Sequence, residues 1–303
     1  MKMKKNTKLV AMLMTAALTL SAFAACGSSE GNTSNGSDNQ NGTGDGFKAG
    51  SEITVMSRED GSGTRGAFVE LTGVEEKNSK GEKVDNTTIE AEITNSTSVM
   101  LTAVAGNKYA IGYISLGSLN DTVKALKING VEATAKNIIA GKYVLARPFN
   151  VAYKEGLSDL GKDFLSFIMS TEGQKVIEDN GYIPAGEAKA YTGSGEGKLV
   201  VAGSSSVSPV MEKLIEAYKA VNKKAEIELQ ESDSTSGMSS LAEGICDIGM
   251  ASRELKDSEK EKGLTPMVIA TDGIAVIVNK DNTTDNLSKD DLKTIYIGEK
   301  TTW

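Results

Sequence analysis

Residues 52–71, EITVMSREDGSGTRGAFVEL, place a polar loop between two apolar patterns of different period. The segment EITVMS alternates apolar and polar side chains, which predicts a strand, whereas Phe68 and Leu71 recur at helical spacing. The loop between them, SREDGSGTRG, contains glycines, hydroxyl side chains and two arginines. We therefore predict a strand–loop–helix junction, with Thr64 as the N-cap of the helix.

Two further segments repeat this design. KLVVA at 198–202 precedes the loop GSSSVSP at 203–209, where Ser208 is predicted to cap the next helix and Pro209 to lie in its first turn. EIELQ at 226–230 precedes the loop SDSTSG at 232–237. Short apolar strands that alternate with amphipathic helices predict α/β layers.

Each loop offers backbone N–H groups and hydroxyls at a helix start, where the helix dipole favours an anion. Arg58 can add paired hydrogen bonds to an oxyanion. The alternatives are plain helix caps and, for Arg58, a surface ion pair with Glu59 or Asp60. With 33 basic and 41 acidic residues the chain is acidic, which disfavours nucleic acid and anionic lipid as partners. Any anion site must therefore be local and built largely of neutral donors.

The chain has no histidine, which excludes Ser-His-Asp and Cys-His catalysis and most zinc sites. Residues 60–63, DGSG, resemble a calcium loop only weakly, and no nucleotide P-loop is present. Cys246 lies among apolar neighbours and is predicted to be buried. These observations favour a binding protein, without metal or cofactor, over an enzyme.

The first 25 residues have a basic head with Lys2, Lys4, Lys5 and Lys8, then an apolar run, which is typical of an export signal. Phe23-Ala24-Ala25-Cys26 resembles a bacterial lipobox, so we expect Cys26 to be lipidated; ordinary cleavage after Ala24 is the alternative. Residues 26–46 are rich in Gly, Ser and Asn and are predicted to form a flexible tether. We expect an extracytoplasmic, membrane-anchored protein.

Five motifs carry a family resemblance: SREDGSGTRGAF, AGSSSVSPVMEKL, CDIGMASREL, DGIAVIVNKDN and KYAIGYISLGS. Together they closely resemble the phosphate-binding proteins of bacterial ABC phosphate importers. The resemblance implies a two-lobed periplasmic-binding-protein fold, a monomer that holds inorganic phosphate between its lobes, and importer permease subunits as partners. The ligand-binding residues that it implies are Arg58, Ser62, Gly63, Thr64, Ser205, Ser206, Ser234 and Ser252.

At the position of Ser252 some members of the family have an aspartate that accepts the proton of hydrogen phosphate. Asp60 or Asp233 could take over that role here. A carboxylate at this position would repel fully ionised sulfate. Without it, the resemblance implies that an oxyanion binds but does not imply a preference for phosphate over sulfate. A receptor for sulfate or molybdate is therefore an alternative; a phosphoryl-transfer enzyme and a surface adhesion or sensing protein are weaker ones.

The order of the motifs differs from that of the family, where the GSSSVSP segment comes first. The chain is thus interpreted as a circular permutant joined through residues 189–198, KAYTGSGEGK; a fragment of a tandem protein is the rival interpretation. The predicted parts are lobe II at 47–146, lobe I at 147–275, and a crossover with return to lobe II at 276–303.

Overall fold

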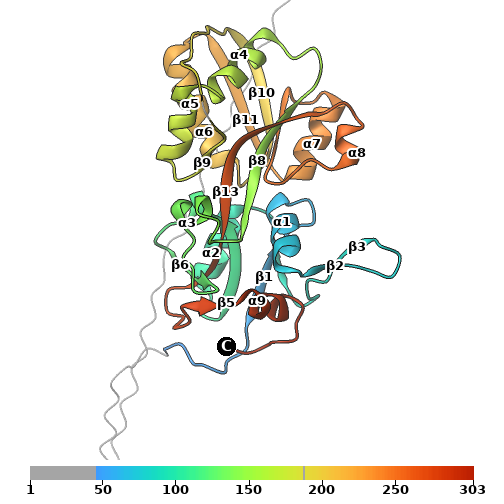
Figure 1. Ribbon diagram of the computed structural model, residues 1–303, viewed down its shortest axis with the longest axis vertical. Coiled ribbons are helices and arrows are strands. Elements are labelled where there is room, and N and C mark those ends of the chain that lie inside the picture. The colour runs from blue at the N-terminus through green and yellow to red at the C-terminus, as the bar shows by residue number, and fades with distance from the viewer. Residues whose placement is uncertain (1–45, 187) are drawn as a thin grey trace, which may run out of the picture. The chain divides into compact units, whose positions relative to one another are not determined.

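The computed structural model describes residues 46–186 and 188–303. The predicted signal segment, the lipobox with Cys26 and the tether up to residue 45 lie outside the described residues. The elements form two groups: lobe I comprises residues 147–273, and lobe II comprises residues 46–146 and 274–303. The α/β two-lobed architecture predicted for the chain is confirmed (Figure 1).

Lobe I is built on a mixed sheet with the strand order β11-β10-β12-β8-β13. Its strands are β8 (Ala146–Tyr153), β9 (Ile183–Pro184), β10 (Gly197–Ser204), β11 (Ala225–Ser232), β12 (Ile248–Ala251) and the first part of β13 (Thr265–Asn279). Its helices are α4 (Asp159–Ile168), α5 (Thr171–Asp179), α6 (Ser208–Val221), α7 (Ser234–Glu243) and α8 (Asp257–Lys260). The helix pair predicted within residues 157–180 is confirmed by α4 and α5.

Lobe II continues the same sheet in the order β13-β5-β1-β4. Its main strands are β1 (Thr54–Arg58), β4 (Glu92–Thr94), β5 (Ala110–Ser115) and β6 (Val123–Ala125). Its helical elements are α1 (Gly63–Thr72), α2 (Thr97–Gly106), η1 (Leu116–Ser118), α3 (Ala135–Ile139) and α9 (Lys289–Tyr296). Two small ladders complete it: β2 (Glu75–Lys77) with β3 (Lys83–Asp85), and β7 (Lys127–Ile128) with β14 (Asn286–Leu287).

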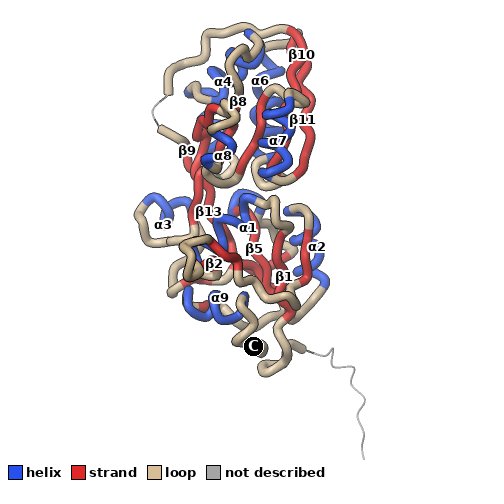
Figure 2. Tube along the Cα trace, turned by 90° about the vertical axis from the view of Figure 1, so that its right-hand side faces the viewer, coloured by secondary structure: helices blue, strands red, loops and turns tan. Residues whose placement is uncertain are grey.

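The strands β8 and β13 connect the lobes. β13 first pairs antiparallel with β8, from Thr265 opposite Tyr153 to Gly273 opposite Ala146. It then pairs with β5, beginning at Ile274 opposite Ser115. Figure 2 shows β13 running from one lobe into the other. The single strand β13 thus belongs to the sheet of both lobes. The predicted lobe limits, at residues 147 and 275, stay a prediction.

Apolar side chains cover both faces of the sheet in each lobe. In lobe I, Phe164 and Tyr218 belong to the core on one face, and Met238 and Cys246 to the core on the other. Cys246 is buried, as predicted, and its burial raises the pKa of the thiol to about 11. In lobe II, Phe68, Tyr113 and Tyr296 pack on one face, and Met100, Val104 and Ile277 on the other. Each lobe therefore has its own hydrophobic core. The polar loops that precede α1, α2, α6 and α7 lie outside these cores, where the two lobes meet.

Candidate functional site

Four strand-to-helix junctions meet between the lobes. Those before α1 and α2 belong to lobe II, and those before α6 and α7 belong to lobe I. Seven hydroxyl side chains of these junctions are buried, and so is the hydroxyl of Ser252, which directly follows β12. The group, called the hydroxyl cluster below, consists of Ser62, Thr64, Thr97, Ser204, Ser205, Ser206, Ser234 and Ser252. Four helix N-termini close to one another provide many N–H donors and a favourable dipole field for an anion.

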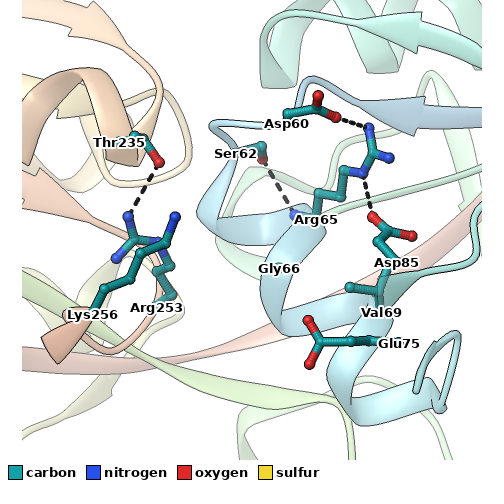
Figure 3. Close-up of a pocket in the computed structure, with 10 residues that line it drawn as sticks. All are labelled: Asp60, Ser62, Arg65, Gly66, Val69, Glu75, Asp85, Thr235, Arg253 and Lys256. Carbon is teal, nitrogen blue, oxygen red and sulfur yellow. Dashed lines mark hydrogen bonds and ion pairs between the residues drawn. The ribbon is translucent and has the colours of Figure 1, made fainter. Parts of the chain in front are cut away.

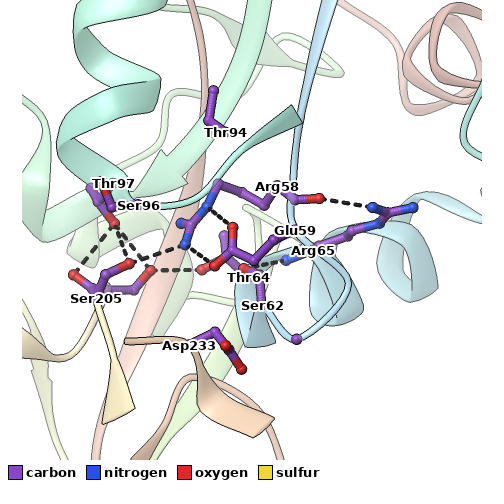
Figure 4. A network of polar contacts seen from close by, with 12 residues as sticks. Arg58, Glu59, Ser62, Thr64, Arg65, Thr94, Ser96, Thr97, Ser205 and Asp233 are labelled. Atoms are coloured by element: carbon purple, nitrogen blue, oxygen red, sulfur yellow. Dashed lines mark hydrogen bonds and ion pairs between the residues drawn. The ribbon is translucent and has the colours of Figure 1, made fainter. Parts of the chain in front are cut away.

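The hydroxyl cluster includes direct contacts across the lobes. The hydroxyls of Thr64 and Ser206 are 2.7 Å apart. Thr97 Oγ1 lies 3.4 Å from Ser206 Oγ and 3.5 Å from Ser205 Oγ. These distances bring the predicted residues of the first and second loops together (Figure 4).

Within lobe I, three serines from three strand ends form a chain of contacts. Ser204 Oγ donates to Ser252 Oγ over 3.0 Å, and Ser234 Oγ lies 3.4 Å from Ser252 Oγ. The Ser252 backbone N–H donates to Ser234 Oγ. A Cβ on Gly63 would lie 2.4 Å from Ser234 Oγ and 2.7 Å from Ser252 Oγ, so only glycine lets α1 approach this chain. The third loop thus joins the same site.

The helix caps differ from the predicted ones. α1 begins at Gly63, with Ser62 as the N-cap, and the Ser62 hydroxyl accepts from the Arg65 N–H. The predicted Thr64 cap is wrong because the helix starts earlier, which leaves the Thr64 hydroxyl to contact Ser206. The predicted Ser208 cap is also wrong: Val207 is the N-cap of α6, and Ser208 donates to the Ser204 carbonyl.

Arg58 is the cation of this site and is 1% exposed. Its Nε and Nη2 donate to the two carboxylate oxygens of Glu59, over 2.8 and 2.7 Å, and Nη2 also donates to Ser205 Oγ over 3.0 Å. Nη1 is buried and has no partner among the described residues. The predicted surface ion pair is therefore half right: Glu59 is the partner, but the guanidinium is buried. Its Nη1 edge is the part of Arg58 that can still donate.

The backbone around Arg58 is held from two sides. The Tyr113 hydroxyl accepts from the Arg58 N–H and lies 2.8 Å from the Ser57 hydroxyl. Burial raises the pKa of Tyr113 to about 12, which keeps this hydroxyl protonated at neutral pH. On the other side, Arg65 Nη1 donates to the Arg58 carbonyl over 2.8 Å. Hydrogen bonds from both sides thus fix the position of Arg58 at the end of β1.

Asp60 and Asp233, the two residues predicted to replace a carboxylate at position 252, make no side-chain hydrogen bond to the described hydroxyl cluster. Asp60 is 96% exposed at its side chain and pairs with Arg65. Asp233 caps α7 and accepts from the N–H and hydroxyl of Ser236. Glu59, through its pair with Arg58, is the acidic side chain connected to the hydroxyl cluster. Among the described residues, no group of three or more histidine, cysteine, aspartate or glutamate side chains could hold a metal ion.

The structure brings all eight predicted residues into one region, and their role in ligand binding stays a prediction. Thr97 and Ser204 also belong to the hydroxyl cluster but were not among the predicted residues. Thr97 follows β4 in the segment TNST at 94–97, which is a fourth polar loop between a strand and a helix. The segment could have been recognised by that pattern, but its strand has only three residues and gives a weak periodic signal.

The sequence model described as "PBP superfamily domain" matches residues 32–172 and 188–303. Phosphate-binding protein PstS 2 of Streptococcus agalactiae is 50% identical over 303 residues, covering 99% of this chain and 98% of that protein. Because this alignment spans nearly all of both chains, that relative has its segments in the same order. Phosphate-binding protein PstS 2 of Streptococcus pneumoniae is 50% identical over 83% of this chain and 86% of its own length.

A similar solved structure is the crystal structure of a phosphate ABC transporter, phosphate-binding protein, from Streptococcus pneumoniae TIGR4. It matches with a TM-score of 0.66 and 50% identity, and the alignment covers 84% of this chain and 98% of that one. The overall arrangement of strands and helices is therefore shared.

Proposed function

This chain belongs to the PBP superfamily and, within it, to the family of the PstS phosphate-binding proteins, and we propose that it captures inorganic phosphate and delivers it to an ABC importer. The observation that carries this proposal is the convergence of four helix N-termini on one buried group of hydroxyls beside Arg58. The names of the relatives support phosphate as the ligand.

The proposed binding relies on dipoles more than on net charge. Ser62, Thr64, Ser205, Ser206 and Ser234 offer hydroxyls, and the first residues of α1 and α7, which are Gly63, Thr64 and Ser234, offer backbone N–H groups. Such neutral donors stabilise an anion without making the surface basic, which fits a chain with a net charge of −8. The Nη1 edge of Arg58 adds a charge-assisted hydrogen bond. Because Glu59 neutralises the charge of Arg58, the net attraction on the anion is reduced, which allows the ligand to be released.

The ligand is proposed to bridge the lobes. Lobe II contributes Arg58, Ser62, Gly63 and Thr64, and lobe I contributes the donors of the loops before α6 and α7. A ligand that contacts both sides stabilises the closed arrangement over any open one, because only the closed arrangement makes both sets of contacts. Delivery then requires that the importer favour the open arrangement.

Calorimetric titration of the purified protein with phosphate, sulfate and molybdate tests this proposal. We expect saturable phosphate binding whose dissociation constant changes little when the salt concentration is raised about sixfold, from about 50 to about 300 mM, because a buried site is poorly screened. Absence of binding heat with phosphate, together with heat from another oxyanion, would overturn it.

A receptor for another oxyanion is the second candidate. The observation that favours it is the hydroxyl of Ser252, which contacts Ser204 and Ser234 and supplies no carboxylate to repel a fully ionised anion. The same titration distinguishes the two candidates. Turnover is not part of the proposal, and release of phosphate from a generic phosphate ester would contradict it.

We also propose that the protein acts as a monomer tethered to the extracytoplasmic face of the membrane through a lipid on Cys26. The support is the basic and apolar pattern of residues 1–25, followed by a polar segment. No helix among the described residues is long and apolar enough to cross a bilayer. Metabolic labelling with a clickable fatty acid, compared between the native chain and Cys26→Ala, tests the anchor.

A further inference from the structure

A second set of contacts joins the lobes beside the hydroxyl cluster. The pocket there has a volume of about 460 Å³ and is lined by residues of both lobes, among them Asp60 and Arg65 from lobe II and Thr235 and Arg253 from lobe I (Figure 3). None of these four is among the residues that the family resemblance implies as ligand contacts. The pocket marks one mouth of the space between the lobes.

Thr235 makes two hydrogen bonds across this mouth. Its backbone N–H donates to the Gly61 carbonyl over 3.2 Å, and its hydroxyl donates to the same carbonyl over 3.1 Å. A Cβ on Gly61 would lie 2.2 Å from Asp233 Oδ1, so a larger residue here would require the Asp233 carboxylate to move. Both partners lie next to the proposed ligand loops, Gly61 before Ser62 and Thr235 after Ser234, but the bonds join protein to protein.

Arg253 orients the Thr235 hydroxyl. Its Nη2 donates to Thr235 Oγ1 over 3.2 Å, which occupies an acceptor site of that oxygen and leaves its hydrogen for Gly61. Glu259 holds Arg253 by two hydrogen bonds, of 2.8 and 2.9 Å, with both side chains mostly buried. Burial raises the pKa of Glu259, but hydrogen bonds from Arg253 and the Lys256 backbone outweigh it and hold that pKa below its usual value. The arginine is therefore fixed by a charged partner at neutral pH.

The acceptor side is fixed as well. Arg65 pairs with Asp60 over 2.8 Å and with Asp85 over 2.8 Å, and it donates to the Arg58 carbonyl. These contacts hold the turn that presents the Gly61 carbonyl. Two arginine-centred clusters, one in each lobe, thus hold the donor and the acceptor of the interlobe hydrogen bonds.

We propose that Thr235, Arg253 and Glu259 form a latch that holds the lobes closed without touching the ligand. They are positioning residues for closure, and the inference rests on the proposed function for its effect on phosphate. Apparent affinity scales with the fraction of molecules in the competent closed state. A latch that favours closure therefore tightens binding, chiefly by slowing release.

Thr235→Val in the full chain is the direct test, since valine keeps the shape of threonine and removes the hydroxyl. One lost neutral hydrogen bond corresponds to about a three- to tenfold effect. We expect the phosphate dissociation rate, measured by stopped flow, to rise by about that factor, with the association rate changed less than about twofold. Thr171→Val is the matched control, because Thr171 also donates its hydroxyl to a backbone carbonyl of lobe I, but away from the mouth.

The fraction of ligand-free molecules that are closed is a second measurement. It would not change if Thr235 and Arg253 only stabilised lobe I. Labels at the exposed positions Lys219 in lobe I and Asp290 in lobe II report the interlobe distance by energy transfer. We expect Thr235→Val and Arg253→Met each to lower the closed fraction, and the double variant to add little, because both act through one hydrogen bond. Glu259→Gln should have a smaller effect in the same direction.

The results of these experiments distinguish a failure of the latch from a failure of the proposed function. If the wild-type protein binds no phosphate, the proposed function fails, and the closed fraction still tests the latch. If Thr235→Val matches the wild type in closed fraction and dissociation rate, the latch is overturned. Loss of thermal stability in Arg253→Met without a change in closed fraction would show a structural role only and would likewise overturn it.

Discussion

Arg58 combines two properties that usually exclude one another: it is a buried charge, and it retains an unused donor. Glu59 compensates the charge through Nε and Nη2, which makes burial tolerable. The orphaned Nη1 remains costly unless a ligand meets it. At this scale the sequence predicted that Arg58 could donate hydrogen bonds to an oxyanion, but it did not predict that Arg58 is buried. An arginine next to two acidic residues in a glycine-rich loop is typical of a surface ion pair.

Replacing Arg58 by methionine should weaken phosphate binding. A charge-assisted hydrogen bond is worth about 1.5–3 kcal/mol, so we expect a roughly ten- to hundredfold higher dissociation constant by calorimetry. Arg58→Lys keeps the charge but not the paired geometry and should fall between the two. An Arg58→Met protein with wild-type affinity would show that the guanidinium faces no ligand.

At the scale of elements, the segment predicted as the permutation join is anchored to lobe I. The Tyr191 and Tyr218 hydroxyls both donate to Asp163 Oδ2 on α4, and Asn222 donates to the Tyr191 hydroxyl. A Cβ on Gly193 would lie 1.8 Å from Asp163 Oδ1. The small and polar composition of residues 189–198 suggested a mere connection, but one tyrosine among them packs against the aromatic rings of α4 and α6.

Asp163→Ala should therefore destabilise the protein, because it removes the acceptor of two tyrosine hydroxyls. We expect a loss of about 2 kcal/mol or more in the free energy of unfolding and a melting temperature lower by roughly 5 °C. Asp159→Ala, at an exposed position of the same helix, is the control. Equal melting temperatures for the two variants would contradict the anchoring role.

The ends of the described chain also meet. The Trp303 N–H donates to the Ser51 carbonyl, and the Gly50 N–H donates to the Trp303 carbonyl. The Trp303 indole lies 6.0 Å from the Phe47 ring and donates to the Tyr109 carbonyl. This proximity is what a circular permutation requires, because the segments at 291–303 and 47–58 must be consecutive in the unpermuted order. The permutation stays a prediction.

At the scale of the whole molecule, the two connecting strands contain a buried ion pair. Arg147 on β8 lies opposite Asp272 on β13, with Nη2 and Oδ2 3.2 Å apart and both side chains at most 2% exposed. Burial raises the pKa of Asp272 to about 6 and lowers that of Arg147, despite their attraction. Arg147 Nε and Nη1 have no partner among the described residues. The pair is thus incompletely compensated at the point where the chain passes between the lobes.

This pair predicts a specific dependence of stability on pH. Because the pKa of Asp272 is higher in the folded state than its ordinary 3.8, the folded protein binds more protons between those two values. Stability should therefore fall as the pH rises from about 4 to about 6, relative to a variant without the pair.

The comparison variant is Arg147→Met with Asp272→Leu, measured by urea unfolding at intervals from pH 4 to pH 8. Replacing both charges avoids leaving one buried charge unpaired. We expect the free energy of unfolding of the double variant to change less with pH in this window. The single variant Asp272→Leu should be destabilised by about 3–5 kcal/mol, because it isolates Arg147. Identical pH profiles for the native protein and the double variant would contradict the assignment.

What the sequence determined by itself is local. Period-two and helical patterns predicted β1, α4 and α5, and the glycine, serine and threonine loops predicted which segments precede helices and which groups could hold an anion, but not the capping residues themselves. These features depend on neighbours a few residues apart, and a single chain displays them directly.

Only the tertiary structure decided which loops meet. Thr64 and Ser206 are 142 residues apart and Gly61 and Thr235 are 174 apart, so no local pattern records their contact. The burial of Arg58 and the contacts at the mouth follow from the packing of one lobe against the other. Contacts made across a long chain depend on the packing of two cores, and that packing is a property of the whole fold.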